Sequence, residues 1–80
     1  MKISVQKLDP FAILPTYSYG GDAGMDLFSS EAAVILPNDK ASVRTGIRMA
    51  IPNGYAGFIW DKSGLAVKHG LKTMAGVIDA

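Results

Sequence analysis

The chain contains 80 residues, of which 49% are hydrophobic and 19% are charged. This composition is typical of one small globular domain and excludes a disordered chain. Ordering a chain of this length costs on the order of 100 kcal/mol of conformational entropy, and so small a domain buries only about 60 to 65% of its unfolded surface. The chain has no cysteine, so neither a disulfide nor a thiolate metal site supports the small core. We therefore expect partner subunits or a further segment of chain to complete it.

The charge balance argues against a long nucleic acid as ligand. Eight Lys and Arg residues oppose seven Asp and Glu residues, for a net charge of +1, and the sequence contains no basic run. The one histidine, His69, excludes zinc sites that need two or three imidazoles. Residues 1–10 lack the apolar core of a signal peptide, and no stretch approaches the roughly 20 apolar residues of a membrane span. The expectation is a cytoplasmic protein that does not enter a membrane.

Turn-forming residues recur at short intervals along the chain and predict short strands, as in a β-sandwich or barrel. The clearest predicted strand is residues 43–51. Its odd-numbered positions carry apolar side chains or threonine, and they alternate with Arg44, Gly46, Arg48 and Ala50. This period of two indicates a strand with one face exposed to water.

Two predicted turns and a second strand continue the β pattern. Residues 37–39 (Pro-Asn-Asp) and residues 52–54 (Pro-Asn-Gly) preset or tolerate turn dihedrals. Residues 55–60 (YAGFIW) are aromatic and aliphatic apart from one glycine, which predicts a strand buried on both faces.

The pattern changes after this strand. In residues 61–70, Ser63 is a good N-cap, residues 65–68 can form a single helical turn, and Gly70 suits the position just after a helix. The sequence therefore predicts a strand, a sharp turn and one turn of helix.

The start of that helix is a candidate anion site. Its first amides have no intrahelical acceptor, so the N–H groups near Gly64 and Leu65 point outward beside the Ser63 hydroxyl and the Lys62 ammonium. Gly64 lets a phosphate oxygen approach the backbone, and Lys62 adds a charge that can follow it. The alternative is that Ser63 only caps the helix and Lys62 is solvated.

Two aspartates are candidate acidic site residues. Asp26 lies in a Gly-rich segment, four residues after Asp22. One or two carboxylates together with substrate phosphates are enough to hold a hydrated Mg²⁺, and the alternative is a turn acid that bonds its own backbone. Asp79 closes the apolar stretch 74–78. It acts either as a base at the edge of buried surface or as a strand-end residue that faces water.

Three segments together resemble a known family. AGMDLFS at 23–29, DKSGLAVKHG at 61–70 and AGVIDA at 75–80 are similar to the first three motifs of the trimeric deoxyuridine triphosphate nucleotidohydrolases (dUTPases), in the same order and with compatible spacing. The resemblance covers nearly the whole chain. It implies one incomplete dUTPase-like domain over residues 1–80, with the all-β fold of a distorted jelly roll of the β-clip type. It also implies a homotrimer with active sites between subunits.

The resemblance further implies hydrolysis of dUTP to dUMP and pyrophosphate, a reaction of nucleotide metabolism, with Mg²⁺ as cofactor. Asp26 matches the first-motif acid, which organises the metal through water. Asp79 matches the third-motif acid, which activates the water that attacks the α-phosphorus. The other matching residues bind substrate, the phosphates at Lys62, Ser63 and Gly64 and the uracil at Ala75, Gly76, Val77 and Ile78. Because the second and third motifs meet across a subunit boundary in the family, Asp79 is expected to serve the Ser63 of a neighbour.

The chain departs from the family pattern at two places. Lys62 stands where arginine is commoner and Asp61 where a proline often stands, so the phosphate contact lacks the planar guanidinium fork. The sequence also stops at Ala80, before the tyrosine that stacks on the deoxyribose, the fourth motif and the Gly-rich arm. We therefore expect an N-terminal portion of such an enzyme, and poor catalysis by this polypeptide alone.

Two alternative functions remain open. One is an enzyme of the dCTP deaminase type on the same fold, which is disfavoured because the one glutamate, Glu31, lies in the wrong region. The other is an inactive fragment that binds nucleotide or associates with other subunits.

Overall fold

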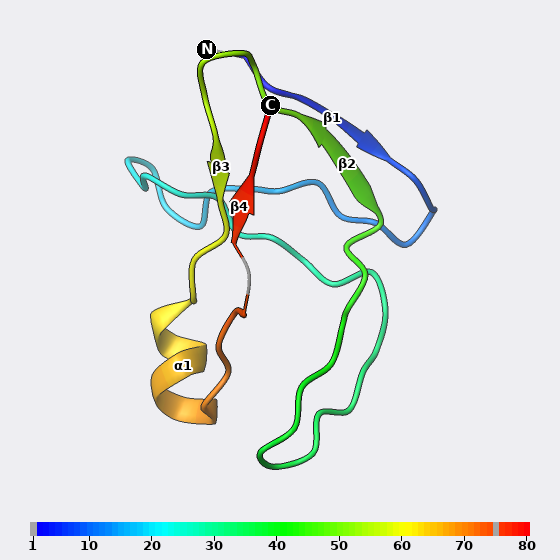
Figure 1. Ribbon diagram of the computed structural model, residues 1–80, viewed down its shortest axis with the longest axis vertical. Coiled ribbons are helices and arrows are strands. Elements are labelled where there is room, and N and C mark those ends of the chain that lie inside the picture. Colours follow the sequence, from blue (N-terminus) through cyan, green and yellow to red (C-terminus); the bar gives the residue numbers. More distant parts are fainter. Residues whose placement is uncertain (1, 75) are drawn as a thin grey trace. The chain divides into compact units, whose positions relative to one another are not determined.

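The structure is a computed structural model that describes residues 2–74 and 76–80. Its elements, in chain order, are β1 (Ser4–Lys7), β2 (Ile47–Ala50), β3 (Gly57–Phe58), α1 (Ser63–His69) and β4 (Val77–Ile78) (Figure 1). Strand β1 pairs with β2, and β3 pairs with β4. The chain divides into two compact units, Val5–Met49 and Met1–Ser4 with Ala50–Ala80.

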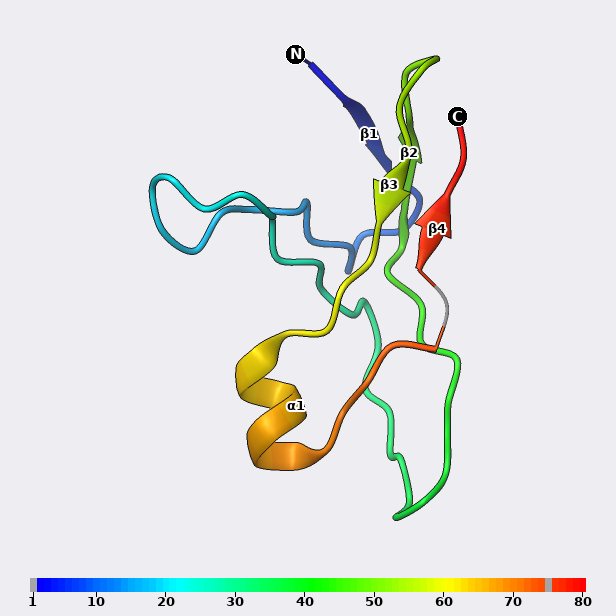
Figure 2. The same cartoon turned by 60° about the vertical axis from the view of Figure 1, so that its left-hand side comes forward.

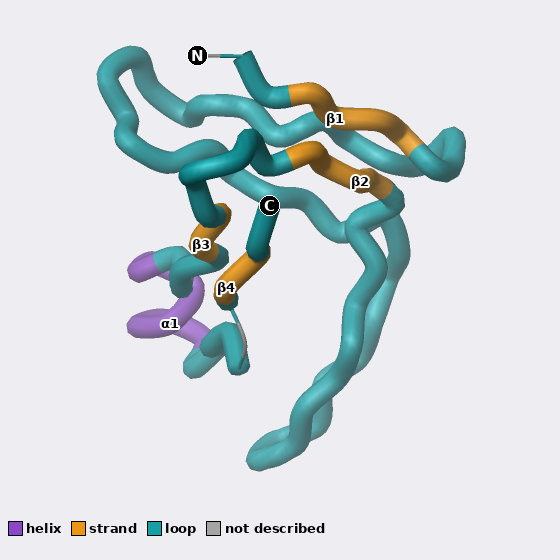
Figure 3. Tube along the Cα trace, turned by 45° about the horizontal axis from the view of Figure 1, so that its top comes forward, coloured by secondary structure: helices purple, strands orange, loops and turns teal. Residues whose placement is uncertain are grey.

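The first unit contains most of the β1–β2 pair and the long loops drawn in teal in Figure 3. In β2, Ile47 and Met49 are half-buried while Arg48 and Ala50 are exposed, so the predicted alternation is confirmed. The Arg48 Nε donates a hydrogen bond to Gln6 Oε1 at 2.6 Å, which joins the exposed faces of the two strands.

The observed strand is shorter than the predicted one, which began at residue 43. The reason lies at Gly46, whose φ of +68° is a left-handed conformation that interrupts an extended strand. Its carbonyl accepts a hydrogen bond from the Leu8 amide at 2.6 Å. A Cβ at Gly46 would collide with the Asp9 carboxylate and lie 2.9 Å from the Ala12 Cβ. Glycine is therefore required where these segments meet.

Both predicted turns are present. The Asp39 amide donates to the Leu36 carbonyl at 3.0 Å around Asn38, whose φ is +61°. In the second unit, the Tyr55 amide donates to the Pro52 carbonyl at 3.1 Å around Gly54, whose φ is +85°. Asparagine and glycine supply the left-handed conformation that each reversal needs.

The second unit is organised by an antiparallel pair, β3 and β4, in which Gly57 is opposite Ile78 and Phe58 is opposite Val77. The Ile59 amide extends this ladder by donating to the Gly76 carbonyl at 2.8 Å. Figure 2 shows α1 following β3 and the chain returning from α1 towards β4. Residues 61–73, which include the helix, therefore form an excursion of the chain at one end of the pair.

The prediction that residues 55–60 are buried on both faces is wrong for this chain. Gly57 and Ile59 are half-buried, but Phe58 is 64% exposed and Trp60 is 83% exposed. A two-stranded pair covers only one face of such a segment. Among the residues that the structure describes, Ala12 is the one buried hydrophobic residue.

The helix α1 differs from its prediction in length and in its cap. It spans seven residues, nearly two turns rather than one. Lys62, with φ −82° and ψ 115°, is the N-cap and makes no side-chain cap hydrogen bond, so Ser63 is the first helical residue rather than the cap. Gly70 ends the helix with φ +66°, as predicted, and its amide donates to the Ala66 carbonyl at 3.0 Å. Within the described part of the chain, no helix is long and apolar enough to cross a lipid bilayer.

Candidate phosphate-binding turn and acidic residues

The predicted phosphate-binding residues lie together at the start of α1, and all three are exposed. The first bond of the helix runs from the Ala66 amide to the Lys62 carbonyl at 2.9 Å. The amides of Ser63, Gly64 and Leu65 precede it and have no acceptor within the helix. A Cβ at Gly64 would meet no atom within 4 Å, so the surface there is open to a ligand.

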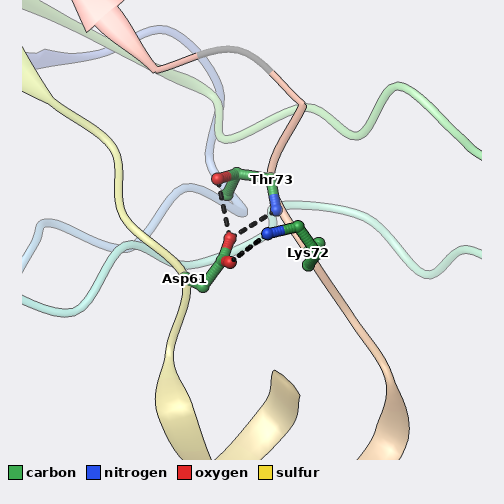
Figure 4. Close-up of polar contacts among 3 residues, drawn as sticks. All are labelled: Asp61, Lys72 and Thr73. Carbon is green, nitrogen blue, oxygen red and sulfur yellow. Dashed lines mark hydrogen bonds and ion pairs between the residues drawn. The ribbon is translucent and has the colours of Figure 1, made fainter.

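Asp61 immediately precedes this turn and is tied to the segment that follows the helix (Figure 4). Its Oδ1 accepts hydrogen bonds from the Thr73 amide at 2.6 Å and the Thr73 hydroxyl at 2.8 Å. Its Oδ2 accepts one from the Lys72 ammonium at 3.2 Å. These bonds to Thr73, followed by the one to Lys72, lower the pKa of the Asp61 carboxyl to about 2.

Asp26 belongs to the other unit, where it is half-buried. Its backbone forms an antiparallel bridge with Thr16, with an amide-to-carbonyl distance of 2.7 Å in one direction and 3.3 Å in the other. Its Oδ2 accepts a hydrogen bond from the Ser18 hydroxyl. The turn acid of this loop is Asp22, whose Oδ2 accepts from the Tyr19 amide at 2.9 Å. The structure thus fixes the Asp26 carboxylate at the base of the Gly-rich loop.

Asp79 directly follows β4 and is exposed. The predicted uracil-facing residues Gly76, Val77 and Ile78 form β4 and its entrance, while Ala75 lies outside the described residues. A Cβ at Gly76 would lie 2.6 Å from the Ile59 carbonyl oxygen, so glycine is needed here for the close approach of two backbones.

The candidate phosphate-binding turn and Asp79 lie at opposite ends of the β3–β4 pair. Strand β3 runs towards α1, and β4 runs away from it. Asp79 continues past the Gly57–Ile78 pair, whereas Lys62 lies beyond the opposite end of the same ladder. One chain therefore does not bring the second-motif turn and the third-motif acid together.

Asp26 is the residue for which the sequence predicts a metal role. The described residues contain no group of three or more His, Cys, Asp or Glu side chains that could enclose a metal ion. Mg²⁺ often keeps several waters and uses only one or two carboxylates with substrate phosphates. A carboxylate such as that of Asp26, which accepts a hydrogen bond from Ser18, is a ligand type that suits metal-bound water.

Comparison with known proteins identifies the family. The dUTPase family model matches residues 11–80. The deoxyuridine 5'-triphosphate nucleotidohydrolase of Thermobifida fusca is 46% identical, over 100% of this chain and 46% of its own length. That of Trichodesmium erythraeum is 42% identical, over 99% of this chain and 57% of its own length. The chain spans about half the length of these curated relatives.

Solved structures agree with the sequence comparison. The dUTPase of Staphylococcus bacteriophage 80alpha with dUPNHPP superposes with a TM-score of 0.93 at 37% identity, over 99% of this chain and 47% of that one. A mutant dUTPase of phage phi11 of S. aureus, described with a structural Mg(II) ion, superposes with a TM-score of 0.93 at 36% identity, over 100% of this chain and 52% of that one. The fold is thus that of the nucleotidohydrolases with an all-β jelly roll, as predicted. The chain belongs to the dUTPase family.

Sequence reasoning missed three side-chain contacts at the candidate sites. The bonds of Asp61 to Lys72 and Thr73 join residues 11 and 12 positions apart, and no local sequence pattern predicts them. The bond of Ser18 to Asp26 spans eight residues. The one available signal was the unexpected Asp61, a carboxylate beside a predicted phosphate site.

Proposed function

We propose that the protein of which this chain is part hydrolyses dUTP to dUMP and pyrophosphate. The observation that carries the proposal is the match of the dUTPase family model to residues 11–80, which contain all three motif segments. The exposed turn at the start of α1 supports it, because backbone amides and a lysine at this turn suit a phosphate group.

The reaction assigns one role to each of three residue groups. Lys62, Ser63 and Gly64 bind the phosphates and offset the charge that develops on the departing pyrophosphate. Asp79 accepts a proton from the attacking water. The oxygen of this water forms a bond to the α-phosphorus while the bond from that phosphorus to the bridging oxygen breaks, and pyrophosphate leaves with the electron pair. The backbone of residues 76–78 would face the uracil.

Mg²⁺ is the proposed cofactor, and Asp26 would hold it through water. Bound to the triphosphate, the ion neutralises phosphate charge. The Ser18 hydroxyl supports this role because it orients the carboxylate, as outer-shell hydrogen bonds do at other metal sites. The structural Mg(II) ion described for the phage phi11 dUTPase is a property of that protein and supports the proposal by similarity.

A homotrimer with sites between subunits is the proposed assembly. The placement of the α1 turn and Asp79 at opposite ends of one ladder supports it, because the acid of one subunit can then serve the turn of another. The exposed Phe58 and Trp60 also support a further protein surface against this unit.

The test replaces the proposed base in the full-length protein. Asp79→Asn is expected to bind dUTP with the parent affinity and to lose turnover by about 10² to 10⁴-fold, because a positioned base acts mainly in the transition state. Pyrophosphate release measures turnover, and isothermal titration with a non-hydrolysable analogue measures binding. Turnover within twofold of the parent would remove Asp79 from this role.

The same assay separates the alternative functions. Ammonia release from dCTP would indicate a deaminase, and no contact or relative described above favours that reaction. Nucleotide-dependent stabilisation of the full-length protein without either product would indicate a binding protein instead.

A further inference from the structure

Asp61 lies where the chain enters the α1 excursion, and its partners lie where the chain leaves it. Three donors converge on the carboxylate, from the Thr73 amide at 2.6 Å, the Thr73 hydroxyl at 2.8 Å and the Lys72 ammonium at 3.2 Å (Figure 4). Both oxygens are occupied, and both are directed at the returning segment. The carboxylate therefore closes residues 62–71 into a loop.

The helix within this loop has little else to fix its position. A seven-residue helix is too short to be stable by itself in water. In the part of the chain that the structure describes, α1 contains no buried residue. Bonds near its C-terminal end, such as Leu71 amide to Leu65 carbonyl at 3.3 Å, hold the helix to itself rather than to β3 or β4. The Asp61 bonds thus connect the two ends of the excursion directly.

The bonds to Thr73 contribute more to this closure than the ion pair. The Lys72 side chain is 75% exposed and that of Asp61 is 28% exposed, and such exposed pairs contribute little. The two bonds from Thr73 are shorter and reach a charged acceptor, and hydrogen bonds of this kind are about twice as strong as neutral ones.

Asp61 has two opposing effects on the binding of a phosphate, one through its charge and one through the position of the turn. The carboxylate is adjacent in sequence to Lys62, so its negative charge opposes an incoming phosphate. Removing that charge should by itself strengthen phosphate binding. A positioning role should weaken it, because the amides of Ser63 and Gly64 would lose their fixed placement. The two effects therefore differ in sign.

We propose that Asp61 is a positioning residue, which holds the Lys62–Gly64 turn in its phosphate-binding geometry by tying the entrance of α1 to Thr73. This inference rests on the proposed function. According to this inference, the affinity for the phosphate chain also depends on a residue outside the turn.

The experiment compares two ligands with the full-length protein, dUPNHPP, which carries a phosphate chain, and deoxyuridine, which does not. Asp61→Ala is expected to weaken dUPNHPP binding about tenfold, through the loss of hydrogen bonds to a charged group, and to leave deoxyuridine affinity unchanged. Asp61→Asn removes the same charge but keeps an acceptor for Thr73, so it should stay within about threefold of the parent. Thr73→Val should weaken dUPNHPP binding about two- to fivefold. Its additional effect in the Asp61→Ala variant should be smaller, because the bonds it breaks are already lost there.

Asp39→Ala is the matched control, because its carboxylate bonds only the neighbouring Lys40 amide among the contacts described, at 2.8 Å, and it should change neither affinity. Equal or tighter dUPNHPP binding by Asp61→Ala, or equal losses for both ligands, would overturn the proposal. If Asp61→Ala does not fold, parent-like dUPNHPP affinity in Thr73→Val overturns it. Failure of the parent itself to hydrolyse dUTP would instead refute the proposed function.

Discussion

At the scale of single residues, three hydrogen-bond donors surround the Asp61 carboxylate. Its pKa falls from 3.8 to about 2, because the amide and hydroxyl of Thr73 and then the ammonium of Lys72 favour the ionised carboxylate. The folded state therefore binds a proton at Asp61 less readily than the unfolded state does. Asp61 stabilises the fold above pH 3.8, and this contribution disappears as the pH falls towards 2.

The lowered pKa of Asp61 gives a prediction for acid unfolding of the full-length protein. The parent is expected to be more stable than Asp61→Asn at pH 5, and the difference should shrink steadily between about pH 4 and pH 2. Urea unfolding midpoints at successive pH values measure it. Thr73→Ala removes the hydroxyl but keeps the amide donor, so it should retain part of the pH-dependent difference. A difference that is constant from pH 5 to pH 2 would contradict the assigned cause.

Single residues also show what local sequence can predict. Gly70, Asn38 and Gly54 all adopt the left-handed conformations that their turn or cap positions require, and the sequence predicted each turn. The bond between Asp61 and Thr73 was not predictable, because it depends on a return of the chain after 12 residues.

At the scale of elements, the β3–β4 pair depends on the close approach of Gly76 to Ile59. The Ile59 amide donates to the Gly76 carbonyl at 2.8 Å, and a Cβ on Gly76 would lie 2.6 Å from the Ile59 carbonyl oxygen. Because the obstacle is backbone, no rotation of a side chain can relieve it. Gly57, on the opposite strand, would place its Cβ 3.2 Å from the Ile51 Cδ1, the movable end of a side chain.

The two glycines therefore predict different costs of the same substitution. Gly76→Ala in the full-length protein is expected to lower the free energy of unfolding by about 2 to 4 kcal/mol, because the strands must separate. Gly57→Ala should change it by less than about 1 kcal/mol, because the methyl gained by a strand residue offsets a small side-chain shift. Urea unfolding measures both. Equal losses for the two variants would show that the backbone approach does not limit the pair.

Element boundaries were harder to predict than element positions. The alternation in residues 43–51 located β2 correctly, but the close approach of Asp9 and Ala12 at Gly46 shortened it. Similarly, Ser63 has a good capping side chain, yet the backbone makes Lys62 the N-cap. At β2, neighbours that are absent from the local pattern lie at the boundary, and at α1 the backbone conformation of Lys62 sets it.

At the scale of the whole molecule, this chain leaves large apolar side chains exposed in each unit. Exposed fractions reach 85% for Val34 in the first unit and 84% for Val67 in the second, where Trp60 is 83% exposed. The composition predicted a small core in need of support, and the chain spans about half the length of the curated relatives it matches. Exposed apolar surface of this kind fits the proposed assembly, in which further protein would cover it.

The proposed sharing of sites between subunits can be tested by mixing variants. Full-length Asp79→Asn and Ser63→Ala are each expected to be nearly inactive as homotrimers. Co-expressed in equal amounts, they should give about one quarter of the parent activity, because random assembly pairs an intact Ser63 with an intact neighbouring Asp79 in that fraction of sites. Pyrophosphate release from the purified mixture measures this fraction. Activity no greater than the sum of the two homotrimers would place both residues in one subunit.

The sequence by itself determined the family and the turns and proposed the residues of the candidate site, because motifs and the conformations of glycine and asparagine are properties of short segments. The exposed face of residues 55–60, the length of β2 and the bond from Asp61 to Thr73 were decided only by tertiary structure. Each depends on which distant segment lies alongside, and a side chain's burial or partner is set by that neighbour rather than by its own type.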